Sequence, residues 1–163
     1  MQRVTLVTDG ACIGNPGPGG WACILRYENQ HEEKFGAEEH TTNNRMEMRA
    51  VIEGLKTLPK AHKVIVTTDS QYVRNGITKW IAQWKRQGWK KKTRGASGTL
   101  EVLNRDLWEQ LDSLATRHQL DWKWVRGHAG HADNMRCDQL ALLAARKQAM
   151  LLRAARRSPR RFV

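Results

Sequence analysis

A chain of 163 residues, 40% hydrophobic and 27% charged, has the length and composition of one globular domain with a sizeable core. Its 28 Lys and Arg residues against 16 Asp and Glu residues give a formal net charge of +12, which favours a polyanionic partner, most commonly nucleic acid. No stretch approaches the roughly 20 apolar residues that span a bilayer, and the sparse cysteines Cys12, Cys23 and Cys137 exclude a disulfide framework and a zinc site.

Hydrophobic periodicity predicts the secondary structure in chain order. Strands are expected at residues 3–8, 21–27, 32–38, 64–68 and 120–125, and helices at residues 43–58, 71–77, 79–87, 104–117 and about 133–157. The third strand is weakly apolar and is therefore expected at a sheet edge. Residues 14–20 (GNPGPGG) are predicted to form a turn, because Pro16 and Pro18 exclude a helix. This order of elements predicts an α/β fold with a mixed sheet flanked by helices.

Half of the basic residues fall into two clusters. The first contains Lys79, Lys85, Arg86, Lys90, Lys91, Lys92 and Arg94, and the second contains Arg146, Lys147, Arg153, Arg156, Arg157, Arg160 and Arg161. We expect one domain over residues 1–145, with residues 146–163 as a basic extension of the last helix or a tail. Because the chain opens directly on a strand pattern, no secretory signal is expected, and we predict a cytoplasmic protein without membrane association.

Two aspartates end predicted strands in the same way. Asp9 follows the first strand in VTDG, and Asp69 follows the buried strand in TTDS. If these strands are neighbours, the two carboxylates meet at the sheet edge where α/β proteins bind ligands. The alternative is local, with Asp9 in a turn and Asp69 as a helix N-cap.

Two further acids lie on the wrong face of a helix. Glu47 shares a side with Val51 and Leu58, and Asp138 faces Ala141 and Ala145. A carboxylate on an apolar face is costly unless it is paired or binds a metal. The alternative for Glu47 is a capping box with Asn44 as the N-cap.

Four inward-facing acids in a chain of charge +12 indicate a cation among them. Oxygen ligands without a Cys or His set favour Mg²⁺ or Mn²⁺, whereas the alternative, salt bridges to buried arginines, finds no suitably placed arginine. Two such ions would fit hydrolysis of a phosphodiester.

The sequence closely resembles the bacterial type 1 ribonuclease H family over about residues 3–145. The matching segments are TDGACIGNPGPGGW (8–21), TTNNRMEM (41–48), TTDSQYV (67–73), the basic segment from Trp80 to Trp89, and VRGHAGHADNMRCDQLA (125–141). The resemblance implies a five-stranded mixed sheet and a monomer that cuts the RNA strand of RNA–DNA hybrids without sequence specificity. It also implies 3′-hydroxyl and 5′-phosphate products, and one or two Mg²⁺ ions, with Mn²⁺ as a possible substitute.

Site residues follow from the same resemblance. Asp9, Glu47, Asp69 and Asp138 would be the catalytic metal ligands, and His128 a catalytic histidine that relays protons or helps to release product. Asn15, Asn44 and Gln71 would contact the minor groove of the hybrid, with Cys12 near the same surface, and Asn15 and Thr42 would hold a phosphate of the DNA strand. The 2′-hydroxyl is the group that distinguishes RNA from DNA at such a surface.

Residues 79–94 resemble the basic handle of the family, expected as two short helices joined at Gly88. We expect Trp80, Trp84 and Trp89 mainly to pack the handle onto the body, although substrate contact by Trp80 and Trp89 stays open. Lys85, Arg86 and Lys90 would contact phosphates without reading sequence. Residues 90–104 look longer than the usual connection in the family, and residues 146–163 are not typical of it.

Two other functions compete with this interpretation. A nuclease with the same fold and metals could cut duplex DNA, which the set Asn15, Asn44 and Gln71 argues against. A non-catalytic hybrid-binding module would have no need of clustered acids that repel phosphate.

Overall fold

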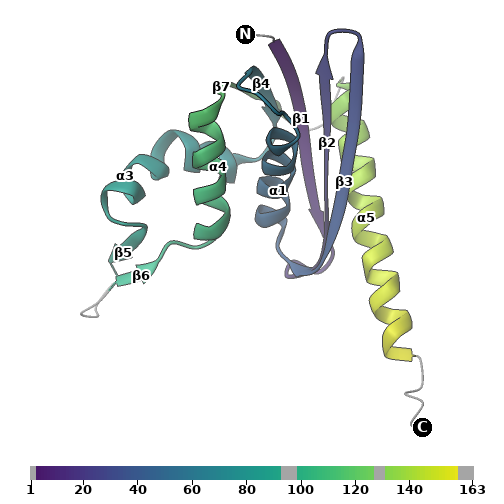
Figure 1. The fold of residues 1–163 in the computed structure, drawn as a ribbon. Coiled ribbons are helices and arrows are strands. Elements are labelled where there is room, and N and C mark those ends of the chain that lie inside the picture. Colours follow the sequence, from purple (N-terminus) through teal and green to yellow (C-terminus); the bar gives the residue numbers. More distant parts are fainter. Residues whose placement is uncertain (1–2, 93–98, 127–130, 158–163) are drawn as a thin grey trace.

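The structure is a computed structural model that describes residues 3–92, 99–126 and 131–157 (Figure 1). The elements in chain order are β1 (Arg3–Cys12), β2 (Gly17–Tyr27), β3 (Gln30–Thr41), α1 (Asn43–Lys56), β4 (Lys63–Thr68), α2 (Gln71–Asn75), the π-helical turn η1 (Gly76–Trp80), α3 (Ile81–Arg86), β5 (Lys90–Lys92), β6 (Thr99–Glu101), α4 (Arg105–Arg117), β7 (Gln119–Trp124) and α5 (Ala132–Arg157).

Five strands form one mixed sheet in the order β3-β2-β1-β4-β7. β1, β2 and β3 pair antiparallel, whereas β4 runs parallel to both β1 and β7. The predicted five-stranded mixed sheet is thereby confirmed, and β3 lies at its edge as expected. The adjacent parallel strands β1 and β4 both point their carboxyl ends at the same edge.

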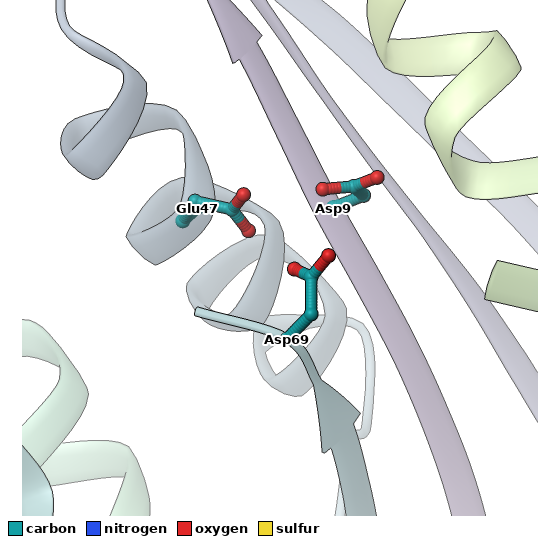
Figure 2. Close-up of side chains that lie close together, drawn as sticks. All are labelled: Asp9, Glu47 and Asp69. Atoms are coloured by element: carbon teal, nitrogen blue, oxygen red, sulfur yellow. The ribbon is translucent and has the colours of Figure 1, made fainter. Parts of the chain in front are cut away.

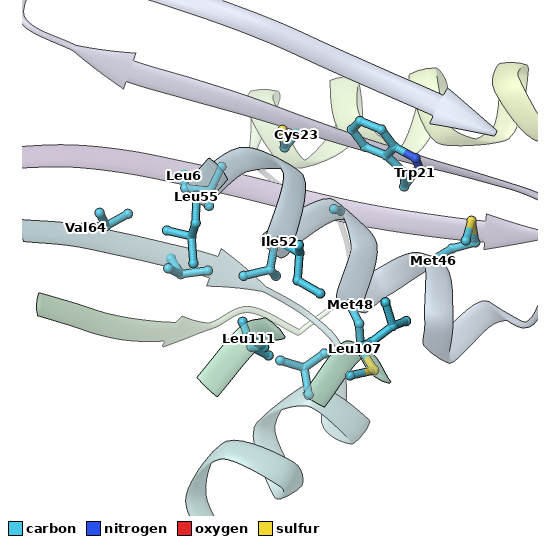
Figure 3. Packing of buried hydrophobic residues seen from close by; sticks show 14 of the residues in the cluster. Leu6, Trp21, Cys23, Met46, Met48, Ile52, Leu55, Val64, Leu107 and Leu111 are labelled. Carbon is cyan, nitrogen blue, oxygen red and sulfur yellow. The ribbon is translucent and has the colours of Figure 1, made fainter. Parts of the chain in front are cut away.

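The two faces of the sheet are covered by different helices. Successive side chains of β1 alternate between them: Leu6 belongs to the buried cluster that includes Leu55 of α1, and Val7 belongs to the one that includes Cys137 and Ala141 of α5. The larger core lies on the α1 side, where Ile52 and Leu55 of α1 are buried together with Leu111 of α4 (Figure 3). It also includes the fully buried ring of Trp108. None of the described helices is long and apolar enough to cross a membrane.

Three predicted boundaries were wrong. β2 already begins at Gly17, so the turn is shorter than residues 14–20. Pro18 fits into the strand because the β2–β3 register shifts between Gly17 and Gly19, where Pro18 has no partner to which it would have to donate. α2, η1 and α3 follow one another without a break. The segment after Gly88 is a strand and not a second handle helix, because Gly88 and Trp89 both adopt positive φ (63° and 64°) and turn the chain into the β5-β6 hairpin.

Candidate active site

Parallel pairing of β1 with β4 sets Asp9 and Asp69 at the same height. Val7 of β1 pairs with Thr67 of β4, and each aspartate follows two residues later. Asp9 is 3% exposed, and its Oδ1 accepts a hydrogen bond from Gly10 N at 2.8 Å. The two strand ends therefore place two carboxylates side by side, as their sequence positions predicted.

Glu47 reaches the same point from α1. The N-cap of this helix is Thr42, whose Oγ1 accepts from Arg45 N at 3.2 Å, so the expected alternative of a capping box on Asn44 is wrong. The first turns of α1 press against β1 at Gly10, where a Cβ atom would lie only 2.5 Å from Glu47 N. The absence of a side chain at Gly10 is what lets Glu47 stand beside Asp9.

The local alternative for Asp69 is also wrong. α2 is capped by Ser70, whose Oγ accepts from Val73 N at 3.1 Å. Asp69 is thus one residue too early to be the cap. Its carboxylate points instead towards Asp9 and Glu47 (Figure 2).

Asp9, Glu47 and Asp69 converge tightly. Each offers a carboxylate oxygen, and these oxygens all lie within 4.8 Å of one another. Burial of Glu47, followed by the negative charges of Asp9 and Asp69, raises the pKa of its carboxyl group well above the ordinary value. Glu47 Oε2 is buried and has no hydrogen-bond partner among the described residues. An oxygen cluster of this kind fits a hard divalent cation such as Mg²⁺.

Asp138 lies on α5 and outside this group of three. Its neighbour Cys137 is fully buried, with Sγ 3.4 Å from Val7 O, so this turn of α5 lies against β1 just before Asp9. Asp138 is half-buried. Its role as a fourth ligand stays a prediction, and His128 lies outside the described residues.

The predicted substrate residues lie around the start of α1. Asn15 Oδ1 accepts a hydrogen bond from Asn43 N at 2.9 Å, which ties the loop before β2 to the start of α1 next to Thr42. Cys12 Sγ lies 3.5 Å from Gly17 O and 3.4 Å from Thr41 O, and Asn44 is exposed. Cys12, Asn15, Thr42 and Asn44 therefore belong to one surface, contiguous with Glu47.

The tryptophans of the handle pack against the body with their rings tilted to one another. Trp84 lies 5.6 Å from both Trp80 and Trp108 and 6.3 Å from Trp89, measured between ring centroids. This is the packing expected for rings that attach the handle. Lys85 forms an ion pair with Asp112 of α4 at 3.1 Å, whereas Arg86 and Lys90 are exposed.

A groove that the sequence did not predict lies on the other side of Asp69. A cavity of about 400 Å³ is lined by Asp69, Ser70, Gln71, Arg74, Trp124, Val125 and Arg126. The Arg74 guanidinium lies 5.6 Å from the centroid of the Trp124 ring, and Gln71 is exposed beside it. The alternation in residues 120–125 predicted a strand, but only its pairing with β4 brings Trp124 next to Thr68 and the carboxylates.

Comparison with known proteins agrees with this geometry. The family model of RNase H matches residues 1–146. The chain is 55% identical to a ribonuclease H of Solibacter usitatus, over 91% of this chain and 98% of that protein, and 56% identical to a ribonuclease HI of Neisseria meningitidis, over 86% and 93%. Among solved structures, LC9-RNase H1, described as a type 1 RNase H, superposes with a TM-score of 0.77 at 35% identity, covering 90% of this chain and 74% of that one. The chain therefore belongs to the ribonuclease H family.

Proposed function

We propose that this protein is an endonuclease that hydrolyses the RNA strand of RNA–DNA hybrids without sequence specificity. The observation that carries the proposal is the convergence of Asp9, Glu47 and Asp69 within 4.8 Å, in a chain whose net charge is +12. Such a cluster repels phosphate unless cations occupy it, and the positive charge elsewhere attracts the polyanion. The products are a 3′-hydroxyl and a 5′-phosphate.

Asp9, Glu47 and Asp69, together with Asp138, would hold one or two Mg²⁺ ions, with Mn²⁺ as a possible substitute. When bound, these ions activate a water molecule and stabilise the leaving oxygen of an in-line displacement. The carboxylates would fix the positions of these ions, and the close packing at Gly10 keeps Glu47 in place. His128 would move a proton near the scissile phosphate or help the product to leave.

The substrate is a duplex of one RNA strand and one DNA strand, and we propose that the protein contacts both. Asn15, Asn44 and Gln71, with Cys12, would contact its minor groove, where the 2′-hydroxyl marks the RNA strand. Thr42 and Asn15 would hold a phosphate of the DNA strand beside the exposed start of α1. The handle would add phosphate contacts through Lys85, Arg86 and Lys90 and ring contacts through Trp80 and Trp89. We propose that the protein acts as a monomer in the cytoplasm.

The decisive experiment compares cleavage of an RNA–DNA hybrid, duplex DNA and duplex RNA, with Mg²⁺ and with excess chelator. We expect cleavage of the RNA in the hybrid alone, and only with the metal. Preferential cutting of duplex DNA would overturn the substrate, and undiminished activity in chelator would overturn the metal site.

A variant separates catalysis from binding. Asp69→Asn should lower kcat by at least about 1,000-fold while leaving hybrid binding intact or tighter, since an interaction needed in the transition state is lost. Asp121→Asn, on the exposed side of β7, is the matched control and should retain full activity. A fully active Asp69→Asn enzyme would contradict the proposal and favour a role for the cluster outside catalysis.

A further inference from the structure

The last helix continues well past the sheet. Near its start, Asp133 and Arg136 of α5 form ion pairs with Arg26 of β2 and Glu33 of β3, at 2.6 and 2.7 Å. The helix then crosses β2 at Gly20, where the missing side chain lets the backbone of Ala141 and Ala145 approach closely. Its last buried residues are Ala145 and Ala149, yet it remains helical to Arg157.

The direction of this extension is set by β2. α5 runs along β2 from its Tyr27 end to its Gly17 end. Gly17 pairs with Thr41, which lies just before the start of α1. The residues after Ala145 therefore leave the sheet at the end that carries Asn15, Thr42 and the carboxylate site. Figure 1 shows the handle hairpin and the end of α5 projecting beyond the body on opposite sides of this sheet end.

The extension carries only positive charge. No acidic residue follows Asp138 in the sequence, whereas seven basic residues do. Arg146, Arg153 and Arg157 are exposed and form no ion pair within the described part of the chain. At 100° per residue they fall on one stripe of the helix, which spans about 16 Å from the first to the third at 1.5 Å per residue.

A lipid surface fits this helix less well than a duplex. An interfacial helix needs an apolar face apart from its basic face. Here the exposed side chain of Met150 lies among the arginines of the stripe, only about 60° of helix rotation or less from each. A polyanion of regularly spaced phosphates matches isolated guanidinium groups that are free to form charge-assisted hydrogen bonds.

We infer that the basic stripe Arg146, Arg153 and Arg157 of α5 is a second nucleic-acid contact, which binds the phosphate backbone of duplex outside the segment held at the carboxylates. This inference rests on the proposed function for the identity of the substrate, an RNA–DNA hybrid. The attraction between the arginines and phosphates does not depend on that function. The handle and this stripe then flank the site from two sides, so a long substrate is held at both. The contact is non-specific in sequence, because it reaches phosphates and not base edges.

The test uses the full chain with Arg146→Gln, Arg153→Gln and Arg157→Gln combined. The control combines Arg3→Gln, Lys60→Gln and Lys63→Gln, which removes the same charge at the opposite end of the sheet, where Arg3 pairs with Lys63. A hybrid of about 30 base pairs, at about 3.4 Å per base pair, is long enough to extend from the carboxylates beyond the stripe. On this substrate, the KM of the stripe variant should be about tenfold higher than that of the unsubstituted protein, with kcat unchanged. The slope of log affinity against log salt should fall by about 2 to 3, at about 0.9 for each phosphate that the protein no longer neutralises.

Substrate length distinguishes the stripe from general electrostatics. On a hybrid of about 8 base pairs, the stripe variant should behave like the control, because a duplex of that length reaches only about 14 Å to either side of its centre. Equal KM values for the stripe variant and the control on the long hybrid would overturn the inference. So would a stripe variant that loses binding to phosphatidylglycerol vesicles while its affinity for the long hybrid is unchanged.

Binding measured in excess chelator separates this inference from the proposed activity. Fluorescence anisotropy with a 30-base-pair duplex DNA requires no cleavage, and the stripe variant should bind it about tenfold more weakly than the control variant. Circular dichroism verifies that the exposed substitutions leave α5 folded. Equal affinities of the stripe variant and the control variant would refute the contact at the stripe, even if the enzyme were active. Weaker binding by the stripe variant would support the contact, even if the chain did not cut hybrids.

Discussion

Gly10 sets the distance between β1 and the start of α1, and therefore the position of Glu47 relative to Asp9. In Gly10→Ala, the new methyl group would lie 2.5 Å from Glu47 N and 2.6 Å from Met46 C, so the backbone of α1 must move. We expect kcat to fall about 100-fold, because displacements of about 1 Å have effects of that size, with a loss of stability of about 1–3 kcal/mol. Steady-state kinetics and urea unfolding measure the two effects.

Gly88→Ala is the control for this substitution. Gly88 has a φ of 63°, and no atom lies within 4 Å of the point that a Cβ would occupy, so alanine strains the backbone without touching the carboxylates. It should lose stability and keep kcat. If Gly10→Ala kept kcat as well, Gly10 would not position Glu47.

His118 gives the fold a predictable response to acid. It is buried where α4 meets β7, and its Nδ1 accepts a hydrogen bond from His62 N at 3.1 Å. Burial, then the charges of Arg117 and His62, lowers the pKa of its ring. The unfolded chain therefore takes up a proton at higher pH than the folded one, and stability is lost as the pH falls through the unfolded pKa of about 6.5.

Unfolding in urea at pH 7.5 and 5.5 measures this loss. His118→Asn keeps an acceptor for His62 N and cannot be protonated, so its stability should fall less between the two pH values than that of the unsubstituted protein. His40→Asn, at an exposed position of β3, should behave like the unsubstituted protein. A pH dependence unchanged by His118→Asn would show that other groups cause the loss.

At the scale of elements, the handle should contribute affinity and little catalysis. Arg86 and Lys90 are exposed, whereas Lys85 forms an ion pair with Asp112 of α4. Arg86→Gln combined with Lys90→Gln should raise KM for a hybrid about fivefold, with kcat nearly constant. The slope of log affinity against log salt concentration should fall by about 2. Lys85→Gln should have a smaller effect on KM, and a larger one would indicate that its pair with Asp112 opens to bind substrate.

The sequence predicted elements best where one face of them is buried. β1, β4, α1 and α4 have clear periodicity, and each was expected within a few residues of its bounds. The β5-β6 hairpin was missed because its strands of three residues are too short to show alternation, and it depends on the turn at Gly88 and Trp89. Continuity of α2, η1 and α3 depends on tertiary packing of Gly76 against Trp108, which no local pattern reveals.

The site was predictable for a related reason. Asp9, Asp69 and Glu47 stood out because each violates the ordinary pattern of its element, and such violations mark functional sites. The caps were less predictable, since Thr42, Asn43 and Asn44 are all good N-cap residues and only the backbone conformation selects Thr42. The groove at Trp124 was missed because it arises from strand order and not from any one segment.

At the scale of the whole molecule, the carboxylate cluster should cost stability in the absence of metal. Asp9 and Glu47 are 3% and 6% exposed and face each other and Asp69, so their charges repel with little screening by water. Asp9→Asn removes one charge and keeps an acceptor for Gly10 N. In chelator, we expect the free energy of unfolding of this variant to be about 1–2 kcal/mol higher than that of the unsubstituted protein. This corresponds to a rise in Tm of about 2–8 °C for a domain of this size.

Magnesium should reverse that order. Binding to the folded state alone stabilises it by RT ln(1 + [L]/Kd), about 2.7 kcal/mol at 100 times Kd, and Asp9→Asn should gain much less because it lacks a ligand. Thermal unfolding of the two proteins, in chelator and in saturating Mg²⁺, measures all four values, with Asp121→Asn as the control that should follow the unsubstituted protein. A variant less stable than the original in chelator would mean that Asp9 serves folding rather than the metal site. Because activity needs the same charges that weaken the metal-free fold, the stabilised variant should also be the inactive one.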